Sequence, residues 1–83
     1  MSPVEALESL PMHLVFSRIH LRAVRVRAGY SRPRLAWETS LAASTIKSYE
    51  QGYSNPSVAA LGRLAGALGC GVNEFYSAAS DVA

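Results

Sequence analysis

The sequence predicts an all-α fold, a single domain of five helices preceded by a helical N-terminal extension. Apolar residues recur at intervals of three and four along most of the chain, whereas no segment alternates apolar and polar residues as a half-buried strand does. Glycine follows most of the helical runs, where a left-handed C-terminal cap favours it. With 83 residues, 49% of them apolar, the chain has room for one core.

Two helical segments are expected before Gly29. Residues 2–5 (Ser-Pro-Val-Glu) form a capping box with proline at the first helical position, which begins a short helix that ends near Leu10. Pro11 interrupts that helix. From residue 12 to residue 28 the apolar spacing is roughly helical and Gly29 suits the cap, so we expect one long helix there.

Four shorter helices follow, each bounded by residues that favour helix ends. They are expected at residues 31–39, 43–51, 58–68 and 72–79. Ser31 supplies an N-cap for the first of them, and either Asn55 or Ser57 supplies one for the third. Gly52 and Gly69 follow the second and the third, where their free φ angle ends a helix.

The charge is unevenly distributed along the chain. All eight basic residues lie between Arg18 and Arg63, a stretch that holds only two of the six acidic residues. Such a basic middle attracts polyanions. Solvated helix faces often carry similar charge, so this pattern by itself leaves the partner open.

Several classes of function are disfavoured by composition. Cys70 is the only cysteine, which excludes an internal disulfide and indicates a buried structural thiol. His13 and His20 have no carboxylate or cysteine placed to complete a metal site. No Ser-His-acid order and no glycine-rich loop before a helix is present, so we expect neither an enzyme nor a cofactor. No membrane span or signal peptide is expected, which favours a cytoplasmic protein.

The middle of the chain resembles a known family. The resemblance rests on Leu21 and Val24, on Arg25 four residues before Gly29, and on three segments: YSRPRLAWETSLAASTIKSYEQG, NPSVAALGRLAGALG and VNEFY. Together these are similar to the phage Cro and lambda-repressor-like helix-turn-helix family, also called the xenobiotic-response-element class. The resemblance implies an N-terminal extension of residues 1–20, a DNA-binding domain of residues 21–79 and a tail of residues 80–83.

In such proteins the third helix of the domain, which corresponds to residues 43–51 here, lies in the major groove. The second helix, residues 31–39 here, crosses the phosphate backbone. The resemblance therefore implies that double-stranded DNA is the partner and that four residues face the bases: Ala43, Ser44, Lys47 and Ser48. Few of these side chains can form two hydrogen bonds to one base. We therefore expect modest direct readout, with backbone contacts and DNA shape adding affinity.

A second set of residues is expected to contact the DNA backbone: Arg32, Arg34, Thr45, Tyr53 and Asn55. For the two arginines there is also a physical argument, because cations in the first turn of a helix oppose the macrodipole and a nearby phosphate would reverse that effect. Solvated surface charge is the alternative for both. Tyr53 has an alternative too, since it could pack over the core.

The resemblance also implies a structural ion pair. Arg25 and Glu50 match an arginine and a glutamate that lock the first helix to the third. The sequence departs from the family at Arg32, where glutamine is usual, at Ser40, where the turn usually has glycine, and at Ala42, where a polar cap is expected. These departures weaken the local helix starts rather than the fold.

Partners other than DNA are also expected. Members of this class usually bind as homodimers, through either the N-terminal extension or residues 72–76 here. Trp37, Phe75 and Tyr76 are the candidates for a protein-partner surface, because exposed aromatic residues are favoured at interfaces. The leading function is a repressor-like transcriptional regulator of a phage or a bacterium. The alternative is an antitoxin or anti-regulator that mainly binds a protein such as a toxin.

Overall fold

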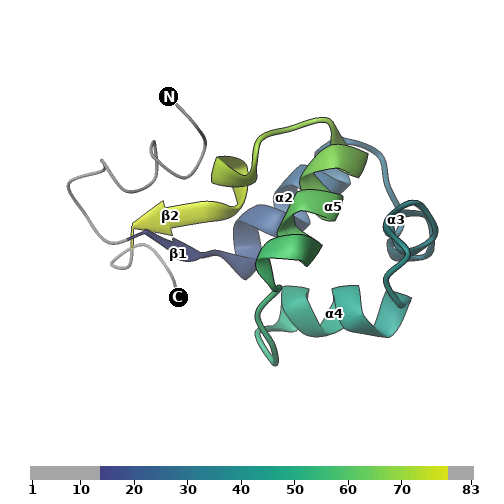
Figure 1. Cartoon of the computed structure of the whole chain (residues 1–83), viewed down its shortest axis with the longest axis horizontal. Helices are drawn as coiled ribbons and strands as arrows, with labels where there is room; N and C mark the ends of the chain where they lie inside the picture. The colour runs from purple at the N-terminus through teal and green to yellow at the C-terminus, as the bar shows by residue number, and fades with distance from the viewer. Residues whose placement is uncertain (1–13, 79–83) are drawn as a thin grey trace.

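A computed structural model describes residues 14–78, which form four α-helices, one 3-10 helix and two short strands (Figure 1). In chain order the elements are β1 (Leu14–Phe16), α2 (Arg18–Arg27), α3 (Arg32–Thr39), α4 (Ala43–Gln51), α5 (Val58–Leu68), the 3-10 helix η1 (Val72–Phe75) and β2 (Tyr76–Ala78). The predicted helical fold class is confirmed. The helix expected at residues 2–10 lies outside the described residues.

Serine hydroxyls fix the starts of three helices. Ser17, Ser31 and Ser57 each accept a hydrogen bond from the backbone N–H three residues later, at 3.1–3.2 Å. These bonds satisfy donors that have no partner inside the helix. Ser57, rather than Asn55, is therefore the cap of α5. At the C-terminal end of α4, Gly52 adopts the left-handed conformation with φ 81°.

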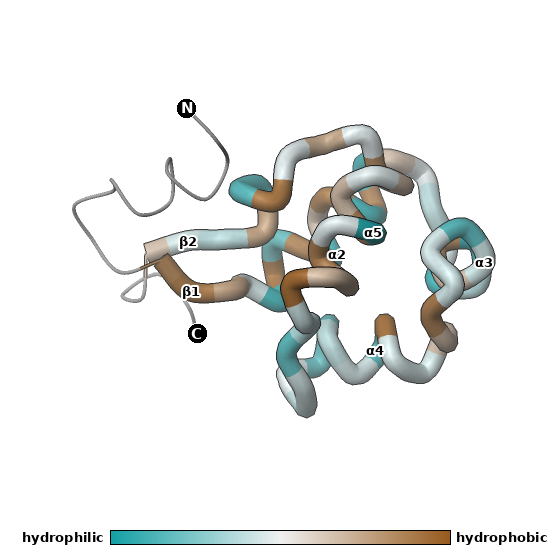
Figure 2. The backbone as a smooth tube through the Cα atoms, in the orientation of Figure 1, coloured by the Kyte–Doolittle hydropathy of each residue, from teal (hydrophilic) through white to brown (hydrophobic). Residues whose placement is uncertain are grey.

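The core lies where the four α-helices and η1 meet. Five elements each contribute one fully buried large side chain: Leu21, Leu35, Ile46, Leu64 and Phe75. Figure 2 shows how hydrophobic residues recur between hydrophilic ones along the helices. Burial of each such side chain is worth about 1.5–3 kcal/mol. This shared core sets the angles between the helices.

The predicted long helix at residues 12–28 is wrong at its start. The helix α2 begins only at Arg18, and Leu14–Phe16 form the strand β1. The predicted helix at residues 72–79 is also wrong, because η1 ends at Phe75 and the chain then continues as β2. The two strands are antiparallel, with Phe16 opposite Tyr76.

The physical reason for this difference is at Ser17. Its backbone is extended, with φ −112° and ψ 112°, as an N-cap requires. Its N–H donates to the carbonyl oxygen of Phe75 at 2.7 Å. A pairing between residues so far apart in sequence leaves no trace in local spacing, and strands of three residues are too short for alternation to be seen.

Candidate nucleic-acid interface

The helices α3 and α4 form a helix-turn-helix unit. They are joined by a short turn in which Ser40 adopts the left-handed conformation, φ 59°, at the position that glycine usually fills. The Thr39 hydroxyl donates to the carbonyl of Leu35 at 2.6 Å, which satisfies a polar group buried at this corner. Ala42 precedes α4 without a side-chain cap, as the sequence indicates.

The residues expected to face the bases lie on α4. Its inner side carries Ile46, Tyr49 and Glu50, all buried. On the other side Ser44 and Lys47 are exposed, and Ala43, Thr45 and Ser48 are half-buried. Lys47 forms no ion pair with any residue between 14 and 78. Its ammonium group is therefore available to a ligand at this face.

The loop after α4 continues the same surface. The hydroxyl oxygens of Ser48 and Ser54 lie 2.8 Å apart, which ties the last turn of α4 to the loop. Tyr53 is 80% exposed, and Asn55 is exposed as well. Tyr53 therefore does not cover the core, and its ring and hydroxyl face solvent.

Glu50 is the centre of a charged cluster that joins three helices. Its carboxylate, fully buried, accepts two hydrogen bonds from Arg25, at 2.6 Å from Nε and 2.9 Å from Nη2. Arg25 also donates to the carbonyl of Tyr30 at 2.8 Å. Arg32, on α3, donates from Nε to the same Glu50 at 3.1 Å. Two guanidinium groups share one carboxylate, so the cluster keeps a net positive charge.

This cluster changes the interpretation of the two arginines in the first turn of α3. Arg32 has a buried partner in Glu50, so its position does not need a phosphate to offset the macrodipole. Arg34 forms an exposed pair with Glu38 at 3.6 Å, and its guanidinium lies 4.0 Å from the centre of the Tyr30 ring. The macrodipole argument therefore loses force for both residues. The side chains still reach solvent, with 32% of Arg32 and 55% of Arg34 exposed.

Among residues 14–78, the structure indicates raised pKa values for Tyr30 and Cys70. The nearby Glu38 carboxylate, chiefly through hydrogen bonding, raises the pKa of Tyr30. Burial raises the pKa of the Cys70 thiol, although that side chain is half-buried and not buried as predicted. Both groups therefore stay protonated and uncharged near neutral pH.

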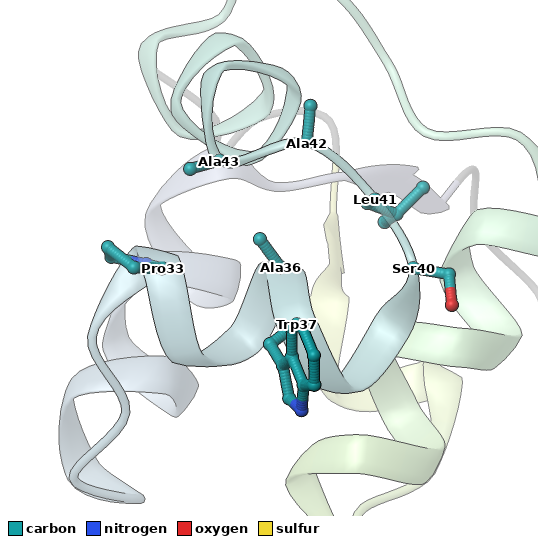
Figure 3. Close-up of a pocket in the computed structure, with 7 residues that line it drawn as sticks. All are labelled: Pro33, Ala36, Trp37, Ser40, Leu41, Ala42 and Ala43. Carbon is teal, nitrogen blue, oxygen red and sulfur yellow. The ribbon is translucent and has the colours of Figure 1, made fainter.

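The three residues proposed for a partner surface lie in different environments. Trp37 is 87% exposed on α3 and borders an open apolar groove between α3 and the start of α4, where Ala36, Leu41 and Ala43 also lie (Figure 3). Phe75 is wrong as a surface residue because it is fully buried in the core. Tyr76 is half-buried on β2. Of the three, only Trp37 has most of its surface exposed to solvent.

One basic residue near this interface was not predicted. Arg18, at the start of α2, lies against Gly52 at the end of α4: a Cβ placed on Gly52 would be 3.0 Å from the Arg18 Cδ. Its spacing of seven residues from Arg25 is the only sequence feature that indicates it, because residues so spaced share a helix face.

Other kinds of site are not seen in the described part of the chain. Between residues 14 and 78 no three histidine, cysteine or acidic side chains come together as a metal site requires. His20 Nδ1 lies 3.3 Å from the Tyr76 carbonyl, and His13 is outside the described residues. No helix in this range has the length and hydropathy to cross a membrane.

Comparisons with known proteins agree with this geometry. A family model described as a helix-turn-helix domain matches residues 18–75. The restriction-modification controller protein C.AhdI from Aeromonas hydrophila is 31% identical, with a TM-score of 0.68 over 70% of this chain and 88% of that one.

The match extends to a regulator bound to DNA. SinR, the master regulator for biofilm formation, in its complex with DNA, is 28% identical, with a TM-score of 0.64 over 68% of this chain and 90% of SinR. In its complex with the SinI protein the figures are 27% and 0.66, over 70% of this chain and 57% of that one. No curated protein sequence gave a significant match.

Proposed function

Because the chain belongs to the helix-turn-helix domain family, whose model spans residues 18–75, we propose that it is a transcriptional regulator that represses by occupying operator DNA. The observation that carries this proposal is the exposed face of α4, with Ser44 and Lys47 in solvent and the neighbouring loop continuing it. The DNA complex of SinR supports it. In this role α4 enters the major groove and α3 crosses the backbone.

The charge of the described residues supports the same role. Residues 14–78 hold all eight cationic side chains and three of the six acidic ones. We propose base contacts from Ala43, Ser44, Lys47 and Ser48 and backbone contacts from Arg32, Arg34, Thr45, Tyr53 and Asn55. We further propose a homodimer on two half-sites and the division into residues 1–20, 21–79 and 80–83.

The experiment that tests the function is selection of bound fragments from the source genome by the purified protein, followed by affinity measurements on the enriched duplex over a salt series. We expect a two-fold symmetric site, with log affinity falling by about 0.9 per unit of log salt for each phosphate neutralised. If no fragment is enriched and only weak binding to any DNA remains, operator binding is not the function of this chain.

Lys47 is expected to contribute both affinity and base preference. The variant Lys47→Ala should bind the operator more weakly by about 1–3 kcal/mol and should lose preference at one position of each half-site. Affinities on duplexes carrying every single base change measure this. An equal loss on all duplexes would instead assign Lys47 to a phosphate. The melting midpoint is the control, since an exposed side chain should leave stability within about 0.5 kcal/mol.

A second candidate function is favoured by Trp37. An exposed tryptophan beside an apolar groove is suited to contact a protein partner. SinR has a protein partner in its complex with SinI. The alternative is therefore an antitoxin or anti-regulator whose helix-turn-helix domain binds a toxin or another regulator.

Trp37→Ala separates the two functions. Because the side chain is 87% exposed, we expect the melting midpoint and the operator affinity to change little. Purification from the native host measures the alternative: a protein that accompanies the parent at fixed stoichiometry and is lost from the variant would favour it. Identical composition of the two preparations would contradict it.

A further inference from the structure

The start of α2 places a cation beside the end of the recognition helix. Arg18 is the first residue of α2, and its aliphatic stem lies over Gly52, the residue that ends α4. Arg18 and Arg22, one turn further along, line an open groove together with Arg27 and Glu50. The guanidinium of Arg18 therefore stands next to the loop that begins at Tyr53.

Arg18 has no counter-ion among residues 14–78. The three acidic side chains of this range are Glu38, Glu50 and Glu74, and the ion pairs that form involve Arg34, Arg25 and Arg32 instead. The helix dipole disfavours a cation in the first turn of α2, and that turn contains no acidic residue to offset this effect. A site with unbalanced positive charge remains, in which Arg18 is half-buried.

The spacing between Arg18 and Arg25 indicates which face of α2 carries this positive charge. The two residues are seven apart, so they share a face of α2 and are separated by about 10 Å along its axis. Arg25 binds Glu50 on α4, and Arg18 lies against Gly52 on the same helix. Positive charge thus extends from Arg32 on α3 through Arg25 to Arg18 on α2.

We infer that Arg18 is an additional phosphate contact of the operator complex, on the DNA strand that passes the C-terminal end of α4. This inference rests on the proposed function, because a helix in the major groove has phosphates at both of its edges. Arg25 is buried and its guanidinium is bound to Glu50 and to the Tyr30 carbonyl, so it does not compete with Arg18 for that phosphate. Gly52 permits the contact, since any larger residue there would displace the Arg18 side chain.

The test compares three variants of the full chain: Arg18→Gln, Arg18→Lys and Arg27→Gln. Arg27 is the matched control because it is an exposed arginine at the other end of the same helix, nine residues from Arg18, where it lies beside His20 and Glu74. Affinity for the selected operator duplex is measured over a salt series. For Arg18→Gln we expect the slope of log affinity against log salt to become less steep by about 0.9 for each Arg18 at a phosphate, and by about 1.8 for a homodimer.

The controls separate a phosphate contact from a packing role. Arg18→Lys keeps the charge and is expected to keep the parent slope, and Arg27→Gln is expected to keep it as well. If Arg18 serves only to cover Gly52, Arg18→Gln will lower the melting midpoint but leave the slope unchanged, and the inference is overturned. If the parent itself binds no operator, the proposed function fails and the inference fails with it.

Discussion

Glu50→Gln is expected to lower the free energy of unfolding by about 3–5 kcal/mol, because it leaves Arg25 and Arg32 without the carboxylate that both of them bind. The glutamine amide oxygen can still accept hydrogen bonds, but its NH2 group cannot, and the neutral amide does not compensate the buried positive charge. For a domain of this size the loss corresponds to a fall in melting midpoint of about 12 °C or more. Thermal and urea unfolding of the parent and the variant measure it.

The matched control is Glu38→Gln. Glu38 also pairs with an arginine, Arg34, but at 3.6 Å and with side chains that are 36% and 55% exposed. An exposed pair of this kind is worth less than about 1 kcal/mol. Equal losses for the two glutamine variants would mean that burial of Glu50 gives its ion pairs no special role. A melting midpoint unchanged in Glu50→Gln would refute the structural role of the cluster.

Phe75→Ala is the second change with a large expected effect. Phe75 is fully buried among Leu21, Leu64 and the other core residues, so its removal leaves a cavity and should cost about 3–5 kcal/mol. The whole free energy of unfolding of a small domain is only about 5–15 kcal/mol. We therefore expect a protein that melts far below the parent, as measured by denaturant unfolding.

Val58→Ala is the control for Phe75→Ala. Val58 is 87% exposed on α5, so the loss of its two methyl groups should change stability by less than about 0.5 kcal/mol. A loss for Phe75→Ala as small as that would show that the aromatic ring is not part of the core. That outcome would also reopen Phe75 as a contact for a protein partner.

The sequence predicted those parts of the fold that depend on neighbouring residues. Helices α3, α4 and α5 were expected within one residue of their observed limits, because serine or glycine marks every end locally except the start of α4. The strands β1 and β2 were missed because each is stabilised by residues about sixty positions away. The segment before Ser17 was read as helix for the same reason.

The candidate site, too, was predicted only where it depends on residues that are close in sequence. The exposed face of α4 follows from helical spacing once Ile46 and Tyr49 are placed inside. The resemblance supplied the pair of Arg25 and Glu50, but nothing in the sequence indicated that Arg32 shares that carboxylate. Contacts of this kind depend on how α2, α3 and α4 pack together, so single-sequence reasoning does not reach them.

The strand pair also determines where the described fold can be extended. Leu14 and Ala78 are opposite each other in register, so the chain enters and leaves this fold at one place. Figure 1 shows that place at the end of the molecule opposite α3. A reporter protein fused beyond either strand would therefore be attached at the end remote from α3. For the same reason, a circularly permuted chain would need only a short linker between the two strands.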